Sequence, residues 1–397
     1  MDAHILEWLG LVARWIHVIV GIAWIGTSFY FNWLNDQLRP PETPSEGVDG
    51  EVWSVHGGGF YRVTKFSVAP DVLPKRLHWF KWEAYSTWLS GMVLLVLVYY
   101  LNADLYLMDP ATGVTAAAGI AISLGVLLGG WLGYHLLCRS PLVNRTIMLV
   151  LTGLVLVSAV AYGLSLWLSD RASYLMVGAM VGTIMAANVF FVIIPSQRAM
   201  VNAMAAGRQP DAQRGADAAR RSRHNNYLTL PVLFIMVSSH YPMTYGHAYN
   251  WAVLAGLFIV GVVVRHFFNK KNQEQRYWWI LGAAALAMLA LAFVTAPSPA
   301  GSTIRDGAVS IADVQGVITQ RCTPCHANQP SYPGIAFAPL GIVLETPEEI
   351  EARKAQIYAV TVATRTMPLG NVTGMTEEER SVLDAWAASQ RTVGSEQ

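Results

Sequence analysis

The chain has 397 residues, of which 53% are hydrophobic and only 13% are charged. Soluble domains carry roughly 25% charged residues, so this composition excludes an ordinary soluble protein and indicates one embedded in a lipid bilayer. The formal net charge of +1 gives no reason to expect nucleic acid or another polyanion as a partner.

Long apolar runs fill residues 1–296, and a helix of roughly 20 such residues crosses a bilayer. We predict about eight spans, at residues 6–33, 79–101, 113–137, 146–168, 173–196, 227–241, 248–268 and 278–296. The sixth is short and has a proline near each edge, and the fifth could run on into the polar segment after Pro195.

Lys and Arg are distributed unevenly between the connections. They gather in residues 35–82, 138–145, 197–223 and 265–276, whereas the other connections hold only Arg171. Positively charged loops stay in the cytoplasm. An even number of spans then places both ends of the chain on the periplasmic side of a bacterial inner membrane.

The apolar runs stop at a Pro/Gly/Ser-rich stretch, which predicts a linker over residues 297–309. Residues 310–393 then form a second domain with charged residues in helical patterns. The predicted fold is therefore all-α: a polytopic bundle over residues 1–296, followed by a small second domain.

Cys322, Cys325 and His326 form a CxxCH motif. Two thiols at this spacing can each bond one haem, and the adjacent histidine becomes its proximal ligand. A disulfide or a zinc pair is the alternative, but zinc needs further ligands and no cysteine follows. Met367, stiffened by the proline after it, is the predicted sixth ligand, with Met375 as the other candidate.

This motif predicts that residues 310–393 form a small class I cytochrome c domain, and helix-capping patterns support its helical fold. Ser310 with Asp313, and Thr376 with Glu379, predict the starts of two helices, and a Thr-Pro-Glu-Glu sequence at 346–349 predicts a third. Gly316 is predicted to allow the last helix to approach the first.

Ionisable residues inside the spans are candidates for function. His17 lies in the first span and Glu83 in the second, and His224 belongs to a set at the cytoplasmic helix ends that would suit a haem b or a planar anion. The other members of that set are His78, His135 and His266. The glycine run in VHGGGFY, before Arg62, predicts either a close backbone approach or a flexible turn.

The chain resembles the bacterial integral-membrane urate oxidases that end in a cytochrome c domain. The segments that carry the resemblance are Trp15–Asn35, Val55–Lys65, Leu77–Gly91, Arg321–Ala327 and Met367–Arg380. The resemblance implies oxidation of urate to 5-hydroxyisourate without peroxide. Electrons would pass to one covalent haem c and on to a soluble cytochrome c or a terminal oxidase.

His17, Trp24 and Gly26 also resemble the His-x6-Trp-x-Gly pattern of other membrane haem proteins, which implies a haem b on His17. For urate, a flat anion, Arg62 or Arg198 would supply the cation and Glu83 or His224 the base. Two other functions stay open: a quinol-linked electron-transfer subunit without urate chemistry, and a transporter fused to a redox sensor.

Overall fold

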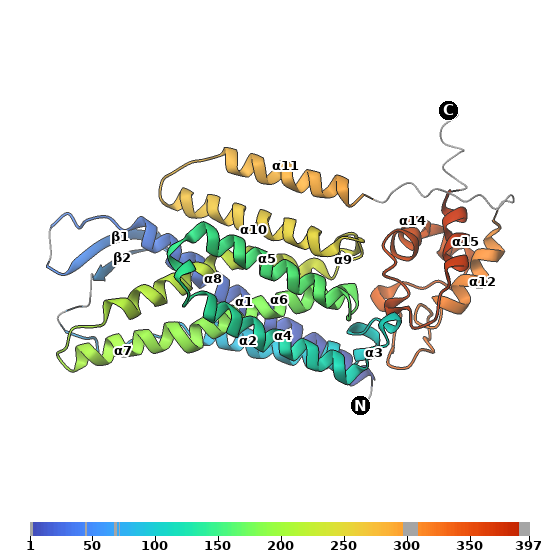
Figure 1. The fold of residues 1–397 in the computed structure, drawn as a ribbon, viewed down its shortest axis with the longest axis horizontal. Helices are drawn as coiled ribbons and strands as arrows, with labels where there is room; N and C mark the ends of the chain where they lie inside the picture. Colours follow the sequence, from blue (N-terminus) through green and yellow to red (C-terminus); the bar gives the residue numbers. More distant parts are fainter. Residues whose placement is uncertain (1–2, 44–45, 67–69, 71, 297–308, 389–397) are drawn as a thin grey trace.

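The structure, a computed structural model, describes residues 3–43, 46–66, 70, 72–296 and 309–388. It is mostly helical, as predicted. A long bundle built from the N-terminal three quarters of the chain lies beside a smaller helical domain that contains the CxxCH motif (Figure 1). Nearly all of the predicted linker, and the C-terminal domain beyond residue 388, lie outside the described residues.

Every predicted span forms a helix. The bundle helices are α1 Ala3–Gln37, α2 Trp82–Leu94, α3 Ala103–Tyr106, α4 Ala116–Leu137, α5 Thr146–Ser165, α6 Asp170–Ala187, α7 Ile194–Ala205, α8 Ala212–Ser238, α9 Pro242–Tyr245, α10 Asn250–Asn272 and α11 Trp279–Val294. Five helices are long and apolar enough to cross a membrane: His4–Gln37, Ala116–Leu137, Thr146–Ser165, Asp170–Ala205 and Asn250–Asn272. The full count of eight spans stays a prediction.

The outer surface of the bundle is apolar. Ile22, Val155 and Leu286 are 68%, 66% and 69% exposed. Apolar surface of this extent is unfavourable against water and suits contact with lipid tails. The apolar helices and their apolar outer faces are consistent with a membrane protein.

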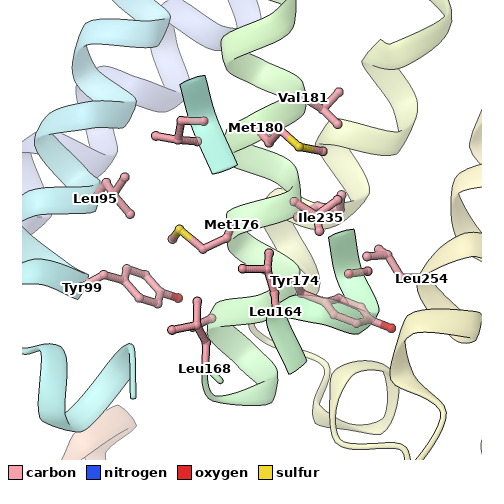
Figure 2. Packing of buried hydrophobic residues seen from close by; sticks show 14 of the residues in the cluster. Leu95, Tyr99, Leu164, Leu168, Tyr174, Met176, Met180, Val181, Ile235 and Leu254 are labelled. Atoms are coloured by element: carbon pink, nitrogen blue, oxygen red, sulfur yellow. The ribbon is translucent and has the colours of Figure 1, made fainter. Parts of the chain in front are cut away.

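Helix α6 lies at the centre of the bundle core. Its residues Tyr174, Met176 and Met180 pack between Leu95 of the segment after α2 and Leu254 of α10 (Figure 2). Gly178 of α6 faces α8 so closely that a Cβ there would overlap Ile235. Small residues at such contacts let membrane helices approach one another.

The predicted boundaries of the sixth span, and the prediction of a polar connection in front of that span, were wrong. Residues 197–223 are not a loop, because α7 runs to Ala205 and α8 begins at Ala212, so α8 starts well before the predicted 227. The Asp211 carboxylate caps α8 by accepting from the Gln213 amide, and α8 continues through Pro231. The fifth span does run on: α6, a π-helical stretch at Asn188–Ile193 and α7 form one continuous helix.

The VHGGGFY segment forms a β-hairpin, a departure from the all-α prediction. Strand β1 Val48–His56 pairs antiparallel with β2 Gly59–Phe66. Gly57 and Gly58 form the turn with φ of 57° and 81°, and nothing lies within 4 Å of a Cβ built at either. The glycines therefore supply the positive φ of a tight hairpin turn, which is the turn alternative of the prediction.

The C-terminal domain contains α12 Ile311–Arg321, α13 Pro347–Ala352, α14 Lys354–Tyr358 and α15 Glu377–Ala388. All three predicted helix starts are confirmed, because each cap pair exchanges hydrogen bonds as a capping box does. The predicted role of Gly316 was wrong, since a Cβ there would meet open space. The core is made instead by larger side chains, among them Val314, Ile318, Leu383 and Trp386.

Candidate functional site

The CxxCH motif forms a tight turn at the end of α12. Cys322 is the C-cap, and its carbonyl oxygen accepts from the amides of Cys325 and His326 at 3.0 and 2.9 Å. Both thiols are free, and burial raises the pKa of Cys322 to about 12 and also raises that of Cys325. The raised pKa values follow from the enclosure of both thiols within the folded domain.

The imidazole of His326 is oriented by a backbone carbonyl. Its Nδ1 lies 3.0 Å from the carbonyl oxygen of Ile342, and the amide of Leu344 donates to the His326 carbonyl at 2.9 Å. A histidine whose Nδ1–H donates to a carbonyl presents Nε2 to a metal, which is how proximal haem ligands are held. The turn and this histidine therefore fit a covalent haem.

The two candidate methionines have different surroundings. Met375 is 4% exposed and belongs to the hydrophobic core. Met367 is half-buried in a loop that Arg380 holds in place, because its guanidinium donates to the carbonyl oxygen of Met367 at 3.0 Å and also to that of Thr361. These contacts favour Met367 as the sixth ligand and Met375 as a core residue.

The C-terminal domain lies beside one end of the bundle (Figure 1), and the loop that contains Met367 contacts that end. A Cβ added at Gly246, just after α9, would lie 2.7 Å from the carbonyl oxygen of Thr364. A Cβ added at Gly370 would lie 3.4 Å from the carbonyl oxygen of Asp104 in α3. The loop with the predicted iron ligand thus faces the bundle directly.

A buried polar cluster occupies the other end of the bundle, around Arg221 of α8. The Asn188 amide donates to Asn225 Oδ1 at 2.9 Å and to the Tyr134 hydroxyl at 3.2 Å. Arg221 donates to Asn188 Oδ1 at 3.3 Å and its guanidinium lies 4.8 Å from the Tyr134 ring centroid. The Tyr134 hydroxyl bonds His224 Nδ1 at 2.8 Å.

A second buried arginine lies on α10. Arg265 is 5% exposed, donates to Asn226 Oδ1 at 2.6 Å and lies 3.8 Å from the ring centroid of Phe29. Its Nη2 has no hydrogen-bond partner. Neither Arg221 nor Arg265 has a carboxylate within ion-pair distance among the described residues.

The structure does not gather the four predicted catalytic candidates. Of these, only His224 joins the polar cluster. His17 Nδ1 bonds the Ser90 hydroxyl at 2.9 Å, and the Glu83 Oε2 is buried without a partner. Arg62 pairs with Glu51 inside the hairpin. Across the described part of the chain, no hydrogen bond joins any two of the four.

The predicted set of four histidines is also divided. His135 and His224 both contact the Arg221 cluster, whereas His266 bonds the Tyr227 hydroxyl and His78 packs against Phe80. Within the described residues, no three His, Cys, Asp or Glu side chains are grouped so as to hold a metal ion. A haem b on His17 is untested by this observation and stays a prediction.

Arg221 is the functional candidate that sequence reasoning missed, because it was counted only as a loop charge. Its signal is helical spacing: Arg221, His224 and Asn225 are three and four residues apart and share one helix face. That pattern becomes visible only when residues 212–226 are assigned to a helix.

The family model described as urate oxidase N-terminal matches residues 3–296, which is the whole bundle. Neither the curated proteins nor the solved structures give a significant match.

Proposed function

Because the chain belongs to the urate oxidase N-terminal family, we propose that it is a membrane-bound oxidoreductase that converts urate to 5-hydroxyisourate and delivers the electrons to a haem c in its C-terminal domain. The observation that carries the proposal is the CxxCH turn with its oriented His326, in a domain whose Met367 loop rests on the family-matched bundle. A soluble cytochrome c or a terminal oxidase would take the electrons onward.

The stoichiometry of this reaction defines what the protein must supply. Urate and one water give 5-hydroxyisourate, two protons and two electrons, so no peroxide is formed. The haem c, when bound, accepts electrons one at a time. Cys322 and Cys325 would hold it by thioethers, and His326 and Met367 would ligate its iron.

The chain's own residues have two tasks in this reaction, anion binding and proton removal. Guanidinium groups suit the first, because a planar fork of donors matches the carbonyl edge of a flat anion. His224 is the best-placed base among the candidates, since it alone belongs to the polar cluster around the buried Arg221. His17, Glu83 and Arg62 have no comparable neighbours.

The membrane arrangement follows from charge and length. We propose about eight spans, with the short α11, α2 and its continuation, and the C-terminal half of α8 completing the five long ones. The arginine-rich end of the bundle then faces the cytoplasm of a bacterium and the haem domain faces the periplasm. Covalent haem attachment in bacteria takes place on that side.

The test is reduction of haem c by substrate. Urate added to air-oxidised membranes that contain the protein should produce the α-band of reduced haem c, and a quinol should not. The Cys322→Ser variant is the control, because it removes one thioether. Reduction by quinol alone would overturn the urate assignment and establish the quinol-linked alternative.

A further inference from the structure

A hollow of about 230 Å³ opens beside the Arg221 cluster, between α4, the α6–α7 helix and the start of α8. Four arginines line it, together with an aromatic ring and a histidine: Arg139, Arg214, Arg220, Arg221, Phe191 and His135. The N-terminal part of α8, which forms one of its walls, lies toward the end of the bundle opposite the C-terminal domain (Figure 1).

The charge of this hollow is unbalanced. Asp217 is the one carboxylate in its lining and pairs with Arg220 at 3.3 Å, and Asp211, outside the lining, pairs with Arg214 at 3.7 Å. Arg139 and Arg221 have no carboxylate within ion-pair distance among the described residues. Arg221 is 5% exposed and its contacts, with Asn188, His135 and the Tyr134 ring, are all with groups that carry no negative charge. A buried guanidinium without a counter-charge is costly, and an anion in the hollow would offset that cost.

The wall of the hollow also favours a flat ligand. Phe191 is 59% exposed and stacks on Trp131, with ring centroids 5.7 Å apart and an interplanar angle of 22°. Phe191 belongs to the π-helical stretch Asn188–Ile193, a rare form that is frequent at functional sites. An aromatic face beside guanidinium forks can stack on a planar ring and bond its edge.

We propose that this hollow binds a planar heteroaromatic anion, with Arg221 as its unpaired cation, Arg220 as a second donor that the ligand shares with Asp217, and Phe191 as its stacking surface. The identity of the anion as urate rests on the proposed function. His224 hydrogen-bonds Tyr134 of the same cluster, so a ligand in this hollow would lie near this histidine. An anionic lipid head group shares the charge of urate but not its flat ring.

The experiment is equilibrium dialysis of radiolabelled urate against the full-length, haem-loaded protein in detergent. The protein is kept reduced with dithionite, so that no electron can leave the ligand and binding is separated from turnover. Arg220→Gln and Arg221→Gln should each weaken binding about 10- to 100-fold, the range for a lost hydrogen bond to a charged group. Phe191→Ala should weaken it less.

Arg223→Gln is the matched control, because it makes the same change of charge on the same helix outside the lining. Arg220 is partly exposed, so its variant keeps the test valid if Arg221→Gln does not fold. Unchanged affinity in both Arg220→Gln and Phe191→Ala would overturn the proposal. The proposal would also be overturned if the protein bound cardiolipin but not urate, and if these variants abolished the cardiolipin binding.

The two proposals fail separately. If urate binds in this hollow but never reduces the haem, the proposed function is wrong and the anion site stands. If urate reduces the haem with an unchanged KM in every variant, the site is wrong and the function stands.

Discussion

Arginines of the C-terminal domain and arginines at the other end of the bundle differ in the charge of their partners. Arg380 donates to two backbone carbonyls and lies 4.0 Å from Glu377, and Arg321 pairs with Glu379 at 2.9 Å. Arg221 and Arg265 are buried as deeply as Arg380, but among the described residues they have only neutral partners.

This difference distinguishes arginines that fix the structure from those that we propose to be available for a ligand. A guanidinium that is fully satisfied within the chain fixes a loop, as Arg380 fixes the Met367 loop. A guanidinium left without a counter-charge in a low-dielectric surrounding is retained for a ligand more readily than for stability. In the proposed function, the C-terminal domain would hold the electron acceptor and the arginine-rich end of the bundle would bind the anion.

The largest expected effect comes from removing the haem attachment. The double variant Cys322→Ser, Cys325→Ser should carry no covalent haem by mass spectrometry and should show no urate-dependent reduction. Urate binding at the bundle, measured by the dialysis described above, should be unchanged, because the thiols lie at the far end. Loss of binding as well would show that the two ends are not independent.

Replacing Arg380 tests the structural half of the comparison. Arg380→Met leaves two carbonyl oxygens without their donor and should lower the free energy of unfolding by about 1–3 kcal/mol. It should also weaken the long-wavelength absorption of the Met–iron bond, because the Met367 loop is released. Arg365→Met is the control, since the Arg365–Glu377 pair is exposed and worth about 0–1 kcal/mol. Equal effects in both would contradict the assigned role.

The contact between the domains gives a smaller effect. Gly246→Val places a side chain against Thr364 and should lift the Met367 loop from the bundle. Reduction of haem c by urate should slow, whereas reduction by dithionite should not, as stopped-flow absorbance would measure. Gly282→Val is the control, because a Cβ at Gly282 meets open space. If both variants behave alike, the docked position is not the one used for electron transfer.

The smallest effect is on acid stability. Hydrogen bonds from the Ser310 hydroxyl and amide lower the pKa of Asp313. Its contribution is therefore fully present above the unfolded-state pKa and is lost as the pH falls through the lowered folded-state pKa. Asp313→Asn should flatten the acid side of a Tm-against-pH profile followed at the haem. An unchanged profile would show that this cap does not contribute.

Local patterns in the sequence were sufficient to predict the helix starts of the C-terminal domain and the existence of the bundle helices. The CxxCH spacing, the three capping boxes and the apolar runs each act over a few residues, so their structural consequence can be predicted without tertiary contacts. The same local patterns did not predict helical segments that are stabilised by packing against another helix. The extent of α8 across Pro231 depends on packing against α10, where a Cβ at Gly261 would lie 3.0 Å from the proline ring.

The candidate anion site could not be predicted in this way, because its residues come from segments far apart in the chain. Tyr134, Asn188 and Arg221 meet only once α4, α6 and α8 are packed together. The sequence by itself determined where the helices of the C-terminal domain begin and which stretches are apolar enough to prefer lipid. Only the tertiary structure decided which buried charge remains without a partner, since a missing counter-charge is a property of everything packed around it.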